Sequence, residues 1–421
     1  METVTGRAVA RRLAVAVYLP FVLSMLGRGM LVPVLPLYLR DAGFNYTLVT
    51  VVVAAAGVGA VVGGLPAGAT AQRLGPEWLF ALATVLTGVV AMLFGISTAV
   101  LALFAFHLTV GLGAVGQRVG VQMLVNDAVG VELRGRAMSM LGGGMRAAMF
   151  VGPIIGGVLV DTVGFTATFV VCGVVTLLGL VPFVAARRSI DGGQRFTRPT
   201  VAASGLVRAL RSHTGLLLLA GTGTALVMTA RAGRNVIVPL VGDELELSAA
   251  AVGFLVAIGT GADLLLFPMS GYLMDRFGRL AAIVPAFSLL GIGLLVLGLS
   301  PTVWGAIVSG VVMGIGNGMS AGTMLTLGGD LAPPDSGPFL SALGMMQDLG
   351  VVLGPLLVGW LADAAGLEVS AIVLAVVMFV AIVWIVVVLG DTARPTRPWI
   401  VRRTRWMAPV VADASTSRMK S

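Results

Sequence analysis

The stretch Gly271-Tyr272-Leu273-Met274-Asp275-Arg276-Phe277-Gly278-Arg279 decides the fold predicted for this chain. It is polar and charged, and it lies between two apolar runs, residues 248–270 and 280–300. A run of about 20 apolar residues is long enough to cross the hydrocarbon core of a bilayer as a helix. The stretch is therefore predicted to be a tight loop that joins two transmembrane helices.

A weaker copy of this loop occurs 203 positions earlier, at Gly68-Ala69-Thr70-Ala71-Gln72-Arg73-Leu74-Gly75. The pattern G-x-L-x-D-R-x-G-R resembles the loop signature of the major facilitator superfamily of transporters, in which the loop is linked to conformational gating. The resemblance implies a gating loop made of Gly271, Asp275, Arg276, Gly278 and Arg279. Its acid would cap a neighbouring helix or pair with an arginine of the other half. In the first copy glutamine replaces the acid and proline the last arginine, which weakens any charge pair there.

Composition also indicates a membrane protein. Hydrophobic residues make up 57% of the 421 residues, charged residues only 11%, and the mean hydropathy is +1.02. Soluble domains contain roughly a quarter charged residues. The basic side chains lie at the ends of apolar runs instead of along one soluble face, which argues against nucleic acid as a partner. With one cysteine, Cys172, no disulfide framework and no metal site is expected, and no cofactor is predicted beyond a proton gradient.

Twelve apolar runs predict an all-α membrane protein with twelve transmembrane helices in two six-helix bundles, the major facilitator fold. The expected organisation is a cytoplasmic N-terminus at 1–12, a first bundle at 13–186, a cytoplasmic linker at 187–213, a second bundle at 214–390 and a basic cytoplasmic tail at 391–421. The predicted spans are 13–39, 47–70, 78–96, 99–124, 137–160, 165–186, 214–241, 248–270, 280–300, 303–327, 339–361 and 368–390.

The arginines predict the orientation. Those of the N-terminus, linker, signature loops and tail all fall on one side of the membrane, whereas the opposite loops offer only Arg40. Because basic loops stay in the cytoplasm, both termini are expected there, in a multi-pass protein of the plasma membrane. The only lysine is Lys420, which favours a GC-rich genome and hence a bacterium.

The two halves match beyond the signature loop. Asp161 corresponds to Asp363, and Gly152-Pro153 to Gly354-Pro355, at a spacing of 202 residues. Such parallel repeats place the substrate site between the halves near the middle of the membrane. Both bundles would then rock about that site.

The fifth predicted helix carries a glycine-rich run that resembles a signature of the antiporters of this superfamily. It comprises Gly144, Gly152, Pro153, Gly156 and Gly157. Physically, glycine lets helices approach closely and proline interrupts the helical hydrogen bonds, so the run is a predicted bend point. Generic glycine packing is the alternative, because the chain contains 58 glycines.

Seven ionisable side chains are predicted to lie within the membrane, where each costs about 2.5–3.5 kcal/mol on insertion scales and so needs a partner or a wet cavity. They are Arg28, Arg118, Arg146, Arg231, Arg234, Asp263 and Asp348. The five arginines, with Asn317 and Gln347, are expected to line the substrate cavity. Arg28 and Arg234 occupy matching places in the first and seventh helices.

Two interpretations of the buried charges stay open. In one, Asp263 and Asp348 carry the coupled proton. In the other, the charges form structural pairs between the halves. His107 is a further proton-coupling candidate, because related antiporters often carry arginine where it falls and histidine titrates near neutrality. A packed, hydrogen-bonded histidine is the alternative at that position.

These observations predict a secondary active transporter, not an enzyme: a proton-coupled exporter of small molecules or drugs, most like the twelve-helix drug:proton antiporters. The excess of arginine leaves an alternative open, an organic-anion exchanger or symporter that uses Arg28 and Arg234. A non-transporting membrane receptor or scaffold is the alternative of another class. The expected partners are a small-molecule substrate, protons and the lipid bilayer, and the expected state is a monomer.

Overall fold

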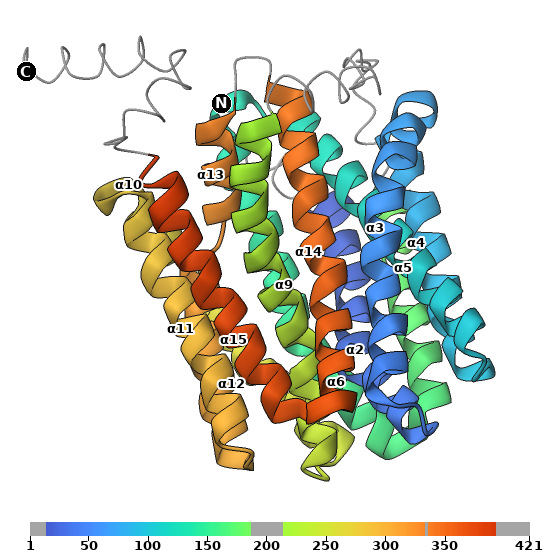
Figure 1. Ribbon diagram of the computed structural model, residues 1–421. Coiled ribbons are helices and arrows are strands. Elements are labelled where there is room, and N and C mark those ends of the chain that lie inside the picture. Colours follow the sequence, from blue (N-terminus) through green and yellow to red (C-terminus); the bar gives the residue numbers. More distant parts are fainter. Residues whose placement is uncertain (1–13, 187–213, 333–335, 393–421) are drawn as a thin grey trace, which may run out of the picture.

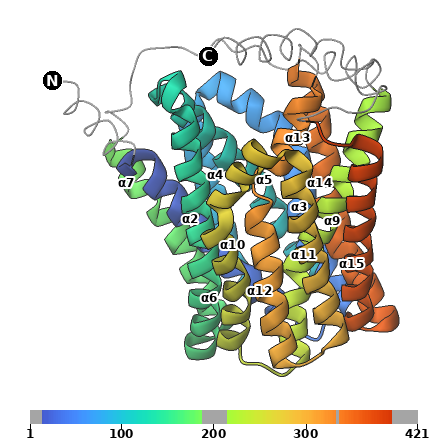
Figure 2. The same ribbon diagram turned by 90° about the vertical axis from the view of Figure 1, so that its left-hand side faces the viewer.

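The computed structural model describes residues 14–186, 214–332 and 336–392. Within these ranges the chain is almost entirely helical and contains no strand. The long helices lie side by side with their axes roughly aligned (Figures 1 and 2). The predicted N-terminus 1–12, the linker 187–213 and the tail beyond Thr392 lie outside the described residues, so these boundaries stay predictions.

The first half of the chain forms α2 to α7. Their bounds are η1 (Ala14–Tyr18), α2 (Leu19–Asp41), α3 (Tyr46–Leu74), α4 (Pro76–Leu93), η2 (Phe94–Ile96), α5 (Val100–Ala128), η3 (Val131–Leu133), α6 (Arg134–Leu178) and α7 (Leu180–Ala186). The second half forms α9 to α15: α9 (Thr214–Glu244), α10 (Ala249–Phe277), α11 (Arg279–Leu299), α12 (Val303–Met319), α13 (Thr323–Leu331), α14 (Ser336–Ala365), α15 (Leu367–Trp384) and η5 (Ile385–Leu389).

Eleven helical segments among the described residues are long and apolar enough to cross a membrane, and one of them contains two crossings. That segment, Arg134–Ala185, has 52 residues, which would extend about 78 Å as one helix, far beyond a hydrocarbon core of about 30 Å. Gly164 interrupts it with φ 80° and ψ 171°. The chain reverses there, so the predicted number of twelve spans is confirmed for the described residues.

The signature stretch is less of a loop than the sequence predicts. Helix α10 continues to Phe277, α11 begins at Arg279, and Gly278 alone turns the chain, at φ 99°. Gly75 makes the same one-residue turn between α3 and α4, at φ 92°. Glycine adopts positive φ without steric cost. The boundary predicted at residue 270 was wrong because the helix extends past the apolar run.

The predicted span 303–327 is also divided. Helix α12 ends at Met319, and α13 starts at Thr323 after Gly322, whose φ is 76°. This break lies inside the bundle, next to the polar network described below. Helix α6 packs against α2 within the first half and against α10 of the second, while α14 packs against α9 and against α3 of the first. The two bundles therefore meet along α6–α10 and α3–α14.

Candidate functional site

An ion pair in the middle of the membrane-spanning region joins the two bundles. Arg146 of α6 places Nε 3.3 Å from Oδ1 of Asp263 on α10, and Asp263 is only 8% exposed. The other carboxylate oxygen accepts a hydrogen bond from Nδ2 of Asn317 at 2.8 Å. The guanidinium of Arg146 also lies 4.4 Å from the ring centroid of Phe267. Both oxygens of Asp263 are thus engaged, one from each side of the bundle interface.

Arg231 extends this network within the second bundle. Its Nε donates to Oδ1 of Asn317 at 2.9 Å, and its Nη2 donates to Oγ of Ser320 at 2.6 Å. Ser320 belongs to the break between α12 and α13, so the break supplies a polar group where a continuous helix would not. The structure brings together four residues predicted for the cavity or proton site, Arg146, Arg231, Asp263 and Asn317. Ser320 is a member that the sequence analysis missed.

Four further predicted residues lie outside this network and are termed the open group: Arg28, Arg118, Gln347 and Asp348. Among the described residues, the hydrogen-bond partner of Arg28 on α2 is the sulfur of Met25, at 3.7 Å. The charge of Arg118, on α5, acts on both Arg28 and Asp348 of α14. Within the described parts of the chain, Arg118, Asp348 and Gln347 make no side-chain hydrogen bond or ion pair with another described residue. These side chains are accordingly available to substrate, water or protons.

His107 lies against the neighbouring helix. Its Nδ1 is 2.8 Å from the carbonyl oxygen of Val52 on α3, and its ring meets Phe94 edge-on at 6.0 Å between centroids. A carbonyl can only accept, so Nδ1 carries a proton and donates. This geometry is what a helix-to-helix contact requires, and no described contact joins His107 to Asp263 or Asp348. Its role in proton coupling stays a prediction.

Two aspartates cap helices across the bundle interface at the lower end of Figure 1. Asp161 of α6 accepts from the backbone N–H groups of Ala249 and Ala250, at 3.0 and 2.9 Å. Asp363 of α14 accepts from those of Tyr46 and Thr47, at 3.0 and 2.8 Å. Free N–H groups and the positive end of the helix dipole favour a carboxylate at an N-terminus. These four bonds are termed the capping latch.

A third cross-bundle contact lies at the same end. Nε of Arg40, the last turn of α2, is 3.2 Å from Oδ2 of Asp243, near the end of α9. The guanidinium also lies 4.3 Å from the ring centroid of Tyr46. The two paired residues are 203 positions apart, the repeat spacing, so equivalent positions of the two halves bind each other. The capping latch and this pair hold the lower end closed.

The signature residues lie at the opposite end and bond within their own bundle. Arg279 places Nε 2.9 Å from Oδ2 of Asp330, and its backbone N–H donates to Asp391 at 3.2 Å. Asp275 has an 85% exposed side chain, 3.8 Å from Arg279. Arg276 donates to the hydroxyl of Tyr272 at 2.8 Å. Among the described residues Asp275 makes no ion pair with the other bundle, so the expected capping or cross-bundle role of this acid stays a prediction.

The glycine-rich run of α6 lets two neighbouring helices approach. A Cβ at Gly152 would lie 2.7 Å from the carbonyl carbon of Gly29 on α2, and one at Gly156 would lie 2.7 Å from the carbonyl oxygen of Met30. Gly157 lies against the carbonyl of Ala249 in α10, across the bundle interface. The carbonyl of Pro153 points toward Gly253, which also lies in α10. Gly144 faces Val22 of α2. The run therefore serves packing both within the first bundle and between bundles.

Replacing Gly152 with leucine is expected to destabilise the protein by about 1–3 kcal/mol, because the backbones of α2 and α6 have no room for a side chain there. Gly143→Leu is the matched control on the same helix, since a Cβ at Gly143 meets nothing within 4 Å. Thermal unfolding of both variants in detergent checks this expectation. Equal unfolding temperatures for the two would contradict the packing role.

The chain is similar in sequence to known membrane transporters. The sequence profile described as Major Facilitator Superfamily matches residues 17–230 and again residues 220–412. An uncharacterized MFS-type transporter of Methanocaldococcus jannaschii is 21% identical over 350 residues, 82% of this chain and 89% of that protein. The bacillibactin exporter of Bacillus subtilis is 27% identical over 34% of this chain, which spans 39% of its length. A multidrug resistance protein B homolog of Mycobacterium tuberculosis is 29% identical over 30% of this chain and 25% of its own.

Solved structures show the same fold. A bacterial homolog of the human lysosomal transporter Spinster, in an inward-facing and unoccupied conformation, superposes with a TM-score of 0.74 at 15% identity, covering 89% of this chain and 96% of that one. A POT family transporter in complex with 5-aminolevulinic acid superposes with a TM-score of 0.72 at 15% identity, over 90% and 96%. Among the described residues no cluster of three or more His, Cys, Asp or Glu could hold a metal ion.

Proposed function

The chain belongs to the major facilitator superfamily, and from that premise we propose that this membrane transporter exports small molecules in exchange for protons by alternating access. The observation that carries the proposal is the ion pair between Arg146 and Asp263, because it crosses the bundle interface in the middle of the membrane-spanning region. A titratable group placed there responds to both the proton and the relative position of the bundles.

The proposed coupling follows from the charges of the network. While Asp263 is ionised, it holds Arg146 of the other bundle and accepts from Asn317. A proton on Asp263 removes the negative charge, so Arg146 loses its counter-ion and the contact across the interface weakens. Loss of the proton restores the pair. Proton binding and the rocking of the bundles are thereby linked through one carboxylate, with Asp348 as a second carrier candidate in the open group.

The direction of transport rests on the predicted orientation. If the arginine-rich loops are cytoplasmic, the capping latch and the Arg40–Asp243 pair close the extracellular end. The described conformation then corresponds to the inward-facing state, which receives substrate from the cytoplasm. Export is also the activity named for one of the relatives, the bacillibactin exporter, and another relative is a multidrug resistance protein B homolog.

A second candidate is an organic-anion exchanger or symporter, favoured by Arg28 and Arg234. Neither side chain forms an ion pair with another described residue, although at the repeat spacing of 203 residues the counterpart of Arg28 is Arg231. Among the described residues the hydrogen-bond partner of Arg28 is a methionine sulfur, and the hydrogen bonds of Arg234 are long, at 3.5 and 3.4 Å. Measured flux of any substrate would eliminate the third candidate class, a non-transporting receptor or scaffold.

The deciding experiment is substrate flux in proteoliposomes under an imposed pH gradient, with ethidium and a panel of organic anions as probes. Uphill movement of a probe that collapses with a protonophore supports proton-coupled transport. Anion flux that is independent of the pH gradient, and that occurs only when an anion is present on the opposite side of the membrane, supports the exchanger. Absence of flux for every probe, with correctly folded protein, supports the receptor or scaffold.

A further inference from the structure

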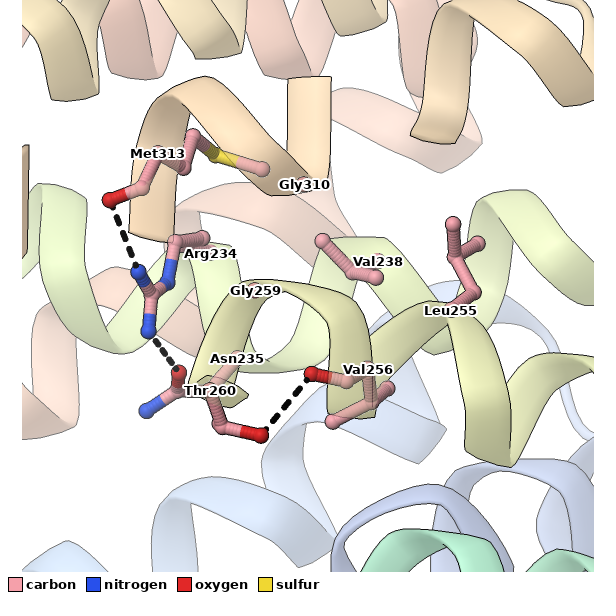
Figure 3. Close-up of a pocket in the computed structure, with 9 residues that line it drawn as sticks. All are labelled: Arg234, Asn235, Val238, Leu255, Val256, Gly259, Thr260, Gly310 and Met313. Carbon is pink, nitrogen blue, oxygen red and sulfur yellow. Dashed lines mark hydrogen bonds between the residues drawn. The ribbon is translucent and has the colours of Figure 1, made fainter. Parts of the chain in front are cut away.

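A pocket in the second bundle has the chemistry of a site for an amphipathic anion. It lies between α9, α10 and α12 and contains about 330 Å³ of empty space, part of it open to solvent. Its polar side consists of Arg234, Asn235 and Thr260, and its apolar wall includes Val238, Leu255 and Met313 (Figure 3). One ligand in this pocket would therefore contact both the guanidinium of Arg234 and the apolar wall.

Arg234 has hydrogen-bonding capacity to spare. A guanidinium carries five N–H donors, whereas Arg234 makes only two described bonds, to the carbonyl of Met313 at 3.5 Å and to Oδ1 of Asn235 at 3.4 Å. Both lie at the long end of the hydrogen-bond range. Arg231, three residues earlier, contrasts with it, because its bonds of 2.9 and 2.6 Å engage it in the central network. Arg234 therefore keeps free donors for a ligand in this pocket.

We propose that this pocket binds the carboxylate of an amphipathic organic anion, with Arg234 holding the carboxylate and the wall of Val238, Leu255 and Met313 holding the apolar body. The inference rests on the proposed transport function and names its substrate class. Arginine matches a planar carboxylate through two parallel hydrogen bonds. The hydroxyl of Thr260 donates to carbonyls of its own helix, at 3.2 and 3.1 Å, so Arg234, and not Thr260, supplies the donors for the carboxylate.

The surrounding charge excludes the opposite class of ligand. Arg231 lies one helical turn from Arg234, and Asp263, the nearest acid in the central network, is already paired with Arg146. An organic cation in the pocket would face the guanidinium of Arg234, with that of Arg231 one turn away, in a medium of low dielectric constant, where repulsion between like charges is strong. The pocket therefore discriminates by charge, beyond the fit of its apolar wall.

Anion export in exchange for protons also has an electrical consequence. When one monovalent anion leaves and n protons enter, n + 1 positive charges move inward. A monovalent cation leaving against the same protons moves only n − 1. An interior-negative potential, imposed with potassium and valinomycin, is accordingly expected to accelerate efflux of the anionic substrate more than efflux of any cationic one.

The binding experiment uses two probes that share a fluorophore and differ in charge, dansylglycine with a carboxylate and dansylcadaverine with an ammonium group. Fluorescence titration of the full chain in nanodiscs of zwitterionic lipid is expected to show binding of dansylglycine only. Arg234→Ala is expected to weaken that binding on the order of tenfold to a hundredfold, the range for hydrogen bonds to charged groups. Arg234→Lys keeps the charge but loses the planar guanidinium, so its affinity for dansylglycine is expected to lie between those of the unchanged protein and Arg234→Ala.

The matched control is Arg136→Ala, which removes the same charge from an exposed position near the start of α6, outside the pocket, and is expected to leave binding unchanged. Tighter binding of dansylcadaverine, or unchanged binding of dansylglycine in both Arg234 variants, overturns the inference. Displacement of dansylglycine by phosphatidylglycerol in the nanodisc would assign the pocket to a lipid headgroup and overturn it as well. Dansylglycine binding without gradient-driven flux would instead overturn proton coupling and leave the pocket assignment standing.

Discussion

Asp263→Asn abolishes pH-gradient-driven accumulation of substrate, down to the level of liposomes without protein, while the protein still folds and still exchanges substrate down its gradient. The amide is nearly isosteric and can still accept from Asn317, whose Nδ2 lies 2.8 Å from the present carboxylate. It carries no titratable proton, so the pairing with Arg146 no longer follows the proton gradient. Uphill flux and counterflow measured in the same proteoliposomes separate the two effects.

The matched control is Asp41→Asn, which neutralises an exposed acid at the end of α2. This change is expected to leave uphill transport by the reconstituted protein intact. Retained gradient-driven transport in Asp263→Asn would rule out this carboxylate as the proton carrier and move attention to Asp348.

The second large effect concerns the capping latch. Replacing Asp161 and Asp363 together with alanine removes four charge-assisted bonds that hold α3 and α10 across the interface. At about 1 kcal/mol for each capped helix, the change shifts the balance between closed and open lower ends by roughly thirtyfold. The fraction of molecules open at that end is expected to rise accordingly.

Spin labels report this shift directly. Val163 and Ala364 are exposed at the lower end on different bundles, and Cys172 is the only native cysteine, so Val163→Cys and Ala364→Cys in a Cys172→Ser background give one labelled pair. Dipolar spectroscopy should show a longer distance gaining population in the double alanine variant. Asp41→Ala, an exposed acid at the same end, serves as control. An unchanged distance distribution would show that the latch does not hold this end closed.

Much of the fold follows from local sequence. Apolar runs of bilayer length predict the twelve spans, and the repeated glycine predicts where α3 and α10 give way to α4 and α11, at Gly75 and Gly278. The helices extend past those runs because a helix does not end where the hydrocarbon ends. The break between α12 and α13 escaped prediction, since Gly322 is one of 58 glycines and only its surroundings make it a turn.

The candidate site was predictable in its members but not in its pairings. The sequence analysis left open which charges pair, and the structure pairs Arg146 with Asp263. Which side chains meet depends on the rotation and packing of helices distant in sequence, and hydropathy carries no information on either. Ser320 went unnoticed because its role arises only from the helix break.

The capping latch shows a different limit. The matched spacing of Asp161 and Asp363 was visible in the sequence, and so was their place in the loops opposite the arginines. Their partners are backbone N–H groups of Tyr46, Thr47, Ala249 and Ala250. Because backbone donors are present at every residue except proline, no residue type marks them. A search for acids that recur at the repeat spacing near helix ends is the signal that would have found them.

The most direct test of the central claim is to follow protons and substrate together in one vesicle population. Proteoliposomes that contain pyranine and whichever of ethidium or dansylglycine the protein transports are diluted into probe-free buffer, and internal pH is recorded as the probe leaves. Proton-coupled export through Asp263 predicts acidification inside that matches the efflux, disappears with a protonophore and is absent in Asp263→Asn. Efflux without any change in internal pH would contradict it.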